Sequence, residues 1–304
     1  MRRLSMIIAP SQDGKEAGVL LRRTLFLSSA ALRRAKALPD GILLDGLPVF
    51  TNVRVRAGQV LSVAVGDAAS NPAIPPVPGP LRILYEDEDL LVADKAGGVP
   101  VHPSQGHHGD TLANFLQEHY RLQGLTAAFH PVNRLDRGTS GLMAVAKHAH
   151  AHERLQKQLT DGTLVRTYLA VCEGRPDPAE GVVDRPIARA PGSVLRRQVA
   201  PGGAPARTRY RVLRTGNGRS LLSLRLDTGR THQIRVHMAW LGCPLAGDFL
   251  YGTELSALPD RFALHSASLR LLQPVTGAEI SLESPLPAAL EELLVPPSHP
   301  DSQE

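Results

Sequence analysis

Cysteine is scarce and long apolar runs are missing from this sequence of 304 residues. Cys172 and Cys243 are the only two cysteines, too few for a disulfide framework and too far apart for a zinc-ribbon spacing. No stretch approaches the roughly 20 apolar residues that a membrane-spanning helix needs. The apolar run that follows Arg2 and Arg3 is too short for the core of a signal peptide. We therefore expect a reduced, cytoplasmic protein with no membrane contact.

The common signatures of nucleotide, metal and serine-hydrolase sites are also missing. The sequence has no G-x-x-x-x-G-K-[ST] pattern, and Ser140 lies outside any G-x-S-x-G turn. His148 and His152 could share a helical face, but no thiol or third ligand at a recognised spacing completes a tetrahedral set. The sequence therefore predicts neither a metal site nor a nucleotide loop.

The overall composition is that of an ordinary folded protein. Hydrophobic residues make up 42% and charged residues 21%, which excludes a chain too polar to collapse. The length allows one or two domains. Lys and Arg number 34 against 29 Asp and Glu, a net charge of +5. This excess favours an anionic partner such as RNA or DNA, although a modest positive charge also serves solubility.

The clearest change in composition is at residues 69–80, where five of twelve residues are proline. Proline at this density suits neither helix nor strand, so we expect a linker. Ahead of it, apolar spacing predicts two short helices, the second capped by Ser29, and then short strands with Asp-Gly and Ala-Gly turns. The helices are expected at 18–27 and 30–38, and the strands within 41–49 and 53–65.

This order of elements, with the stretches LDGLPV at 44–49 and VRAGQVL at 55–61, resembles a small RNA-binding module first described in a ribosomal small-subunit protein, the S-four-like module. The resemblance implies that residues 1–68 form a small α/β RNA-binding module. Arg33, Arg34 and Lys36 would then bind RNA. The alternative is that these charges form an ordinary solvated face.

Beyond the linker, helical and strand patterns are mixed, which predicts an α+β domain over residues 81–295. The final residues, 296–304, are expected to be disordered. Strands are predicted at 81–85, 90–93, 142–147, 165–172 and 222–226, helices at 111–122, 149–159 and 231–241, and a final hairpin at 269–272 and 279–282.

One candidate for chemistry is Asp136, which lies between Arg134 and Arg137 and is followed by the turn residues Gly138 and Gly141. Neighbouring cations favour the ionised form of a carboxyl group, and an ionised carboxylate can act as a nucleophile. The same pattern also describes an aspartate that caps a turn or pairs with arginine on the surface.

A second polar cluster, residues 227–237, lies where a strand is followed by a helix. The start of that helix together with Arg230 suits an anion, either a phosphate or a catalytic carboxylate. The alternative is that Thr231 caps the helix and the basic residues face solvent. Tyr168 lies inside a predicted strand, where it is either a core aromatic or a ring on which a base stacks.

Five motifs follow one another in a fixed order beyond the linker. They are DKAGGVPVHP at 94–103, NRLDRGTSG at 133–141, RTYLAV at 166–171, TGRTHQIRVH at 228–237 and GCPLAGD at 242–248 with Tyr251-Gly252. Together they resemble the RluA family of RNA pseudouridine synthases, over about residues 81–282. Two positions depart from the family pattern: Asn133 stands where many members have His, and Ala96-Gly97 replaces the usual Pro-Ala.

The resemblance implies a mixed, largely antiparallel sheet flanked by helices, with the active-site cleft across its middle. Asp136 would be the nucleophile, Arg230 would pair with Asp136 and with a phosphate, and Tyr168 would stack on the uracil or assist proton removal. The isomerisation needs no cofactor. Further RNA contacts would come from the motif loops, at Arg134, Arg137, Thr139, His232, Gln233 and Arg235.

The implied substrate is RNA, and large-subunit ribosomal RNA is expected because the added module resembles those of enzymes that modify it. Transfer RNA is the alternative. A non-catalytic RNA-binding assembly factor and a carboxylate-dependent nucleosidase are rival functions. The nucleosidase would release free base, whereas a synthase leaves the mass of the RNA unchanged. We expect a monomer.

Overall fold

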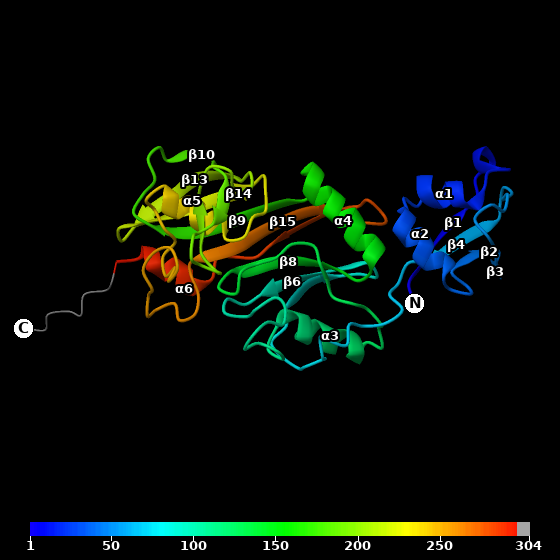
Figure 1. Ribbon diagram of the computed structural model, residues 1–304, viewed down its shortest axis with the longest axis horizontal. Helices are drawn as coiled ribbons and strands as arrows, with labels where there is room; N and C mark the ends of the chain where they lie inside the picture. The colour runs from blue at the N-terminus through cyan, green and yellow to red at the C-terminus, as the bar shows by residue number, and fades with distance from the viewer. Residues whose placement is uncertain (297–304) are drawn as a thin grey trace, which may run out of the picture.

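A four-stranded antiparallel sheet and two short helices form the first part of the computed structural model, which describes residues 1–296. Figure 1 shows this N-terminal part, in blue, beside one end of a larger sheet. The strand order is β1-β4-β2-β3. The elements are β1 (Arg3–Ile7), a 3-10 turn at Pro10–Gln12, α1 (Ala17–Arg23), α2 (Ser29–Lys36), β2 (Ile42–Leu44), β3 (Leu47–Pro48) and β4 (Val60–Ala64).

Helix α2 shows how the sequence forms this part. Its apolar residues Ala31, Leu32 and Ala35 are buried, while its basic residues are exposed. Ser28 is the N-cap, because its hydroxyl accepts a hydrogen bond from the N–H of Ala31 at 3.1 Å. The expected cap, Ser29, is instead the first residue of the helix. Strand β1 was not predicted.

The second sheet has ten strands, eight of them in the order β10-β13-β14-β9-β15-β8-β6-β5, with β16 paired to β15 and β7 to β8. All these neighbours are antiparallel except β15 and β8, which are parallel. The strands are β5 (Ile83–Glu86), β6 (Leu90–Lys95), β7 (His130–Pro131), β8 (Ser140–Ala146), β9 (Val165–Glu173), β10 (Glu180–Asp184), β13 (Arg207–Gly216), β14 (Arg219–Leu226), β15 (Leu264–Leu272) and β16 (Glu279–Glu283).

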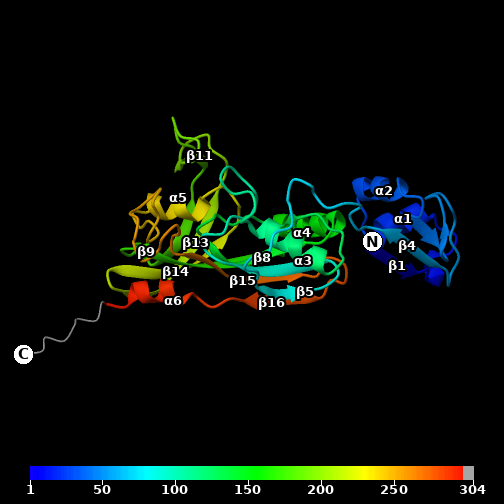
Figure 2. The same ribbon diagram turned by 90° about the horizontal axis from the view of Figure 1, so that it is seen from below.

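Helices pack on both faces of this sheet (Figures 1 and 2). Alternate residues of β6 and β8 pack with α3 and with α4, which is why residues 90–93 of β6 and 142–146 of β8 are all apolar. Helix α5 packs on β9 and β14. The predicted α+β class with a mixed, largely antiparallel sheet is confirmed. The helices are α3 (Leu112–Leu122), α4 (Ala149–Asp161), α5 (Gln233–Trp240), α6 (Ala288–Glu291) and a 3-10 turn at Glu292–Leu294; β11 (Ile187–Arg189) and β12 (Arg197–Val199) form a separate hairpin.

The proline-rich segment 69–80 contains no helix or strand, but it lies along α3. Ile74 is buried, and the Asn114 side chain donates a hydrogen bond to the carbonyl of Pro75 at 2.8 Å. Gly79 lies so close to the ring of Phe115 that an added Cβ would come within 2.1 Å of it. The segment is therefore packed against the larger part.

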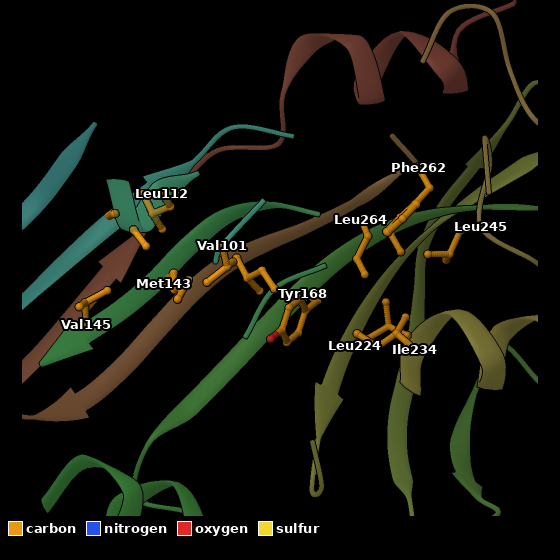
Figure 3. Packing of buried hydrophobic residues seen from close by; sticks show 14 of the residues in the cluster. Val101, Leu112, Met143, Val145, Tyr168, Leu224, Ile234, Leu245, Phe262 and Leu264 are labelled. Carbon is orange, nitrogen blue, oxygen red and sulfur yellow. The ribbon is translucent and has the colours of Figure 1, made fainter. Parts of the chain in front are cut away.

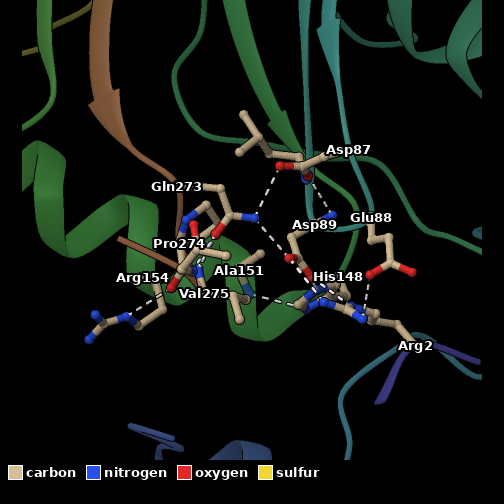
Figure 4. Close-up of polar contacts among 12 residues, drawn as sticks. Arg2, Asp87, Glu88, Asp89, His148, Ala151, Arg154, Gln273, Pro274 and Val275 are labelled. Carbon is tan, nitrogen blue, oxygen red and sulfur yellow. Dashed lines mark hydrogen bonds and ion pairs between the residues drawn. The ribbon is translucent and has the colours of Figure 1, made fainter. Parts of the chain in front are cut away.

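The two parts meet in a polar network (Figure 4). Arg2 of the first part donates its Nε to buried Asp89 at 2.8 Å, and His148 and Gln273 contact the same carboxylate at 3.0 and 2.8 Å. Burial alone would raise the pKa of Asp89, but the hydrogen bonds from His148, Arg2 and Gln273 hold it well below the usual range. The N-terminal part is thus attached through an ionised carboxylate.

The expected disordered tail lies outside the described residues, apart from Pro296, which is in neither a helix nor a strand. Within residues 1–296, no helix combines the length and the apolar character needed to cross a membrane.

Candidate active site

Asp136 lies in the loop that joins β7 to β8, and its side chain is 29% exposed. The loop returns on itself, since the N–H of Thr139 donates to the carbonyl of Asp136 at 3.1 Å. Beside the loop, Figure 3 shows Tyr168 of β9, Ile234 of α5 and Leu264 of β15 in one apolar cluster. The carboxylate is therefore held at the edge of the core, with access to solvent.

Lys95, at the end of β6, binds the backbone of this loop and of the segment that follows β6. Its ammonium donates to the carbonyls of Ala96, Val99 and Arg137 at 2.9, 2.8 and 3.0 Å, so all its protons are used. Burial lowers the pKa of Lys95 to about 7, against the opposing charge of Asp136. The first motif of the sequence thus positions the residue that follows Asp136.

Two glycines allow the loop to pack closely. A Cβ on Gly138 would come within 2.6 Å of the Phe262 ring, and one on Gly141 would come within 2.3 Å of the Ser266 carbonyl oxygen. Gly141 also has a φ of +103°, which side chains rarely adopt. Both positions require glycine, so the loop is fixed by close backbone approach.

The arginine that pairs with Asp136 is Arg235, and the expected pairing with Arg230 is wrong. Arg235 Nη1 donates to Asp136 Oδ2 at 3.3 Å. Arg230 is exposed, and its Nε donates to the carbonyl of Pro205 at 2.9 Å. The physical reason is that α5 begins at Gln233, so Arg235 lies on the helix and points into the core, while Arg230 lies in the turn ahead of it.

Three residues expected to contact RNA are buried in the interior of the site: Thr139, Gln233 and Arg235. That these three contact RNA stays a prediction, and any such contact would be made inside the pocket that they line with Asp136. Gln233 organises the turn before α5, because its amide accepts from the N–H of Arg230 and donates to the carbonyl of Arg207. The N-cap of α5 is His232, with no side-chain cap hydrogen bond, so Thr231 does not cap this helix.

The remaining motif residues are more accessible. Arg134 and Arg137 are exposed, and Arg137 donates to the carbonyl of Gly98 at 3.0 Å. His232 is partly buried, and its Nδ1 lies 2.8 Å from the hydroxyl of Tyr251. Burial lowers the pKa of His232, although the charge of Asp136 opposes this shift.

A cleft of about 1080 Å³ opens over Asp136 and Tyr168. Residue Tyr168 is only 3% exposed and lines this cleft from β9. The cleft has room for an extruded nucleotide together with its neighbours. Arginines outnumber carboxylates in its lining, which holds Arg134, Arg166, Arg197, Arg225 and Arg230 together with Asp136, Asp161 and Asp227. The arrangement can bring a polyanion to the partly exposed carboxylate of Asp136.

Sequence reasoning missed the role of Asp248. This carboxylate is fully buried and accepts two hydrogen bonds from Arg235, at 2.7 and 2.8 Å. The only signal was its place in the fifth motif, after Gly247. Among residues 1–296, no group of three or more His, Cys, Asp or Glu side chains could hold a metal ion.

An arginine-lined cleft across a mixed sheet, with Asp136 in its floor, suits an enzyme that acts on a polyanion such as RNA. The profile of the family described as RNA pseudouridylate synthase matches residues 89–240, half of the chain, and this span runs from β6 to α5. The chain belongs to this family and is an RNA pseudouridine synthase of the RluA type, as the motif order predicted.

Relatives agree with this assignment. The uncharacterized RNA pseudouridine synthase YjbO of Bacillus subtilis is 40% identical over 275 residues, covering 90% of this chain and 97% of that protein. Ribosomal large subunit pseudouridine synthase D of Nitrosomonas europaea is 38% identical over 83% of this chain and 76% of its own length. The solved structure of human RNA Pseudouridylate Synthase Domain Containing 1 has a TM-score of 0.56 and 26% identity, covering 70% of this chain and 89% of that chain.

Proposed function

We propose that this synthase uses Asp136 as its nucleophile to convert uridine to pseudouridine in large-subunit ribosomal RNA. The observation that carries the role of Asp136 is its position: the carboxylate is partly exposed in the floor of the arginine-lined cleft, and Arg235 contacts its Oδ2 over a long 3.3 Å. A carboxylate in this place can reach a nucleotide that has been extruded from its stack.

The reaction breaks the bond between uracil N1 and ribose C1′ and forms a bond between C5 and C1′. The proton leaves C5, and N1 gains one, so the RNA keeps its mass and no redox partner is needed. Asp136 can attack C1′ or C6, or stabilise an oxocarbenium-like centre while the base turns. The ring of Tyr168 lines the same cleft, where it can stack on the uracil or assist removal of the C5 proton.

Binding of the RNA rests on the arginines of the cleft and, in this proposal, on the N-terminal module. The chain divides into a module at 1–68, a linker at 69–80 and a catalytic domain at 81–295. Arg33 and Lys36 are exposed on α2, whereas Arg34 is paired with Glu153 of α4 at 3.3 Å. Arg33 and Lys36 are therefore better placed than Arg34 to bind phosphate.

Two relatives named ribosomal large subunit pseudouridine synthase D, from Nitrosomonas europaea and Escherichia coli, support ribosomal RNA as the substrate. Mapping pseudouridines in ribosomal and transfer RNA from cells with and without the gene tests this part of the proposal. Loss of sites from transfer RNA alone would overturn it.

The role of Asp136 is tested by Asp136→Asn, which keeps the size of the side chain and removes its charge. We expect turnover to fall by far more than tenfold while RNA affinity stays close to that of the wild type. The matched control is Asp184→Asn, which removes one charge from the exposed strand β10. Turnover of the Asp136 variant within about tenfold of wild type, about 1.4 kcal/mol in the barrier, contradicts the assignment.

A further inference from the structure

Arg235 holds two carboxylates unequally. Its Nε and Nη2 form a two-pronged contact with Asp248, at 2.7 and 2.8 Å, whereas one N–H reaches Asp136 at 3.3 Å. The two-pronged contact is the stronger geometry for an arginine and a carboxylate. The positive charge of Arg235 is therefore compensated mainly by Asp248 and only weakly by Asp136.

The position of Asp248 does not depend on α5. The N–H of Ala246 donates to Val171 of β9 at 2.9 Å, which attaches the segment before Asp248 to the sheet. The N–H groups of Leu250 and Tyr251 donate to Asp248 Oδ1 at 3.0 and 3.2 Å. These contacts fix the carboxylate in place.

The guanidinium of Arg235 is also fixed. It lies 4.1 Å from the centre of the Phe262 ring and 5.0 Å from that of Tyr251. Burial lowers the pKa of Arg235, but the hydrogen bonds and charge of Asp248, with the charge of Asp136, outweigh burial and leave the pKa raised. The buried pair of Arg235 and Asp248 is therefore close to neutral as seen from Asp136.

We propose that Asp248 is a positioning residue for pseudouridine formation. It binds Nε and Nη2 of Arg235, so that only Nη1 contacts Asp136, and it neutralises most of the guanidinium charge. Asp136 then has the support of a single N–H and keeps the electron density that an attacking carboxylate needs. This inference rests on the proposed role of Asp136. Without Asp248, the full positive charge of Arg235 acts on Asp136 and makes it a weaker nucleophile.

The test is Asp248→Asn, which leaves an oxygen for the N–H groups of Leu250 and Tyr251 and removes the charge. The probe is unmodified large-subunit rRNA transcribed with tritium at C5 of uridine, because isomerisation releases that tritium. Release by the wild type is the positive control for the proposed function, so its failure would concern that proposal and not this one. We measure the single-turnover rate across pH, RNA affinity and the melting temperature.

We expect the plateau rate to fall at least tenfold with RNA affinity unchanged, and the acid limb of the pH profile to move to lower pH by about half a unit or more. The shift has this sign because an uncompensated Arg235 favours the ionised form of Asp136. The other groups whose charges act near Asp136 are unchanged: Lys95, His232 and Tyr251.

The control is Asp89→Asn, which removes the charge from a partly buried pair with Arg2, where the N-terminal part meets the larger part. It should lower the melting temperature and leave the acid limb in place. Asp248→Glu, which keeps the charge, should also keep the limb in place, and Asp248→Ser replaces the Asn variant if that fails to fold. The proposal is overturned if the acid limb of the pH profile stays in place in Asp248→Asn and Asp248→Ser. It is also overturned if Asp248→Glu or Asp89→Asn moves that limb as far as the neutral variants do.

Discussion

Two arginines of one motif have different surroundings, although they are only five residues apart. Arg235 is buried between Asp136 and Asp248, and Arg230 is exposed at the rim of the cleft. Spacing alone could not separate them, because the expected start of the helix at residue 231 would have left Arg230 at its N-terminal end. The helix begins at Gln233, and the amide of Gln233 closes the turn that carries Arg230 away from Asp136.

We therefore expect Arg235→Lys to be damaging and Arg230→Lys to be mild. A lysine at 235 loses the planar fork that reaches both carboxylates, so turnover should fall by about a hundredfold or more. A lysine at 230 keeps its charge on the cleft rim, so turnover should stay within a few-fold. Steady-state kinetics on one RNA compares the two matched variants. Equal losses would contradict the distinct roles described here.

The loop between β7 and β8 is positioned by neighbouring elements as much as by its own sequence. Lys95 of β6 binds its backbone from one side, and Phe262, just before β15, packs against Gly138 from another. The helices that flank the sheet were predictable because their apolar spacing is local, although Thr111, expected as the first residue of a helix, is the N-cap of α3. Strands β10 to β13 were not predicted. In β13, Arg207, Arg209 and Arg211 alternate with residues 208, 210 and 212, of which only Tyr210 and Val212 are apolar, so the local apolar signal is weak.

Gly141→Ala tests how tightly this loop is packed. The added methyl would meet the Ser266 carbonyl at 2.3 Å, and alanine is strained at a φ of +103°. We expect a loss of about 3 kcal/mol or more in the free energy of unfolding, because both the backbone strain and the β8–β15 pairing are affected. Denaturant unfolding measures it, with Gly124→Ala as a control for φ alone, since that glycine has a φ of +67° in open space. If Gly141→Ala and Gly124→Ala lose similar amounts of unfolding free energy, backbone strain at positive φ explains the effect and close packing against Ser266 does not.

At the scale of the whole molecule, the N-terminal module is docked on the catalytic domain through charged side chains. Arg2 meets Asp89, and Asp67 meets His130 at 2.8 Å, one residue before the cleft-lining Pro131. Composition could predict that residues 69–80 hold no helix or strand, but not these contacts, because they join residues that are more than 60 positions apart. The module thus touches the strand that leads into the Asp136 loop.

The docking contacts should respond to acid. The pKa of Asp89 is lowered in the folded state, despite burial, by its hydrogen bonds from His148, Arg2 and Gln273, so its contribution to stability is present at neutral pH and is lost as the pH falls below about 4. We expect Asp89→Asn to lower the free energy of unfolding by about 2 kcal/mol at pH 7 and by progressively less below pH 4. The loss at pH 7 is kept to this size because Arg2 is partly exposed, so solvent screens its charge. Denaturant unfolding of both proteins across pH checks this, and a difference that grows in acid would contradict it.

Removal of the module tests its proposed role in RNA binding. A chain that begins at Ala69 keeps Ile74 and the packed linker but loses Arg2 and Asp67, so it should fold with reduced stability. It should still modify a short RNA. On full-length ribosomal RNA we expect weaker binding and a shallower slope of log affinity against log salt, by roughly 0.7 to 0.9 for each lost phosphate contact.

Replacing Arg33, Arg34 and Lys36 together by Ala should reproduce part of this change in slope without unfolding the chain. An unchanged slope after removal of the module would show that it has a structural or regulatory role instead. Melting temperatures of the shortened chain and of the triple variant show whether each is folded, so that weaker binding can be assigned to lost phosphate contacts.

The position of β15 in the sheet has a consequence for the order in which this enzyme becomes functional. This strand lies between β9 and β8 and so joins the half of the sheet that carries Tyr168 to the half that carries the Asp136 loop, yet only β16 follows it within residues 1–296. During synthesis, both halves leave the ribosome before the strand that brings them together. The catalytic cleft is therefore assembled by a late, long-range pairing, and a nascent chain that stops short of Leu264 carries every proposed catalytic residue without a site in which they meet.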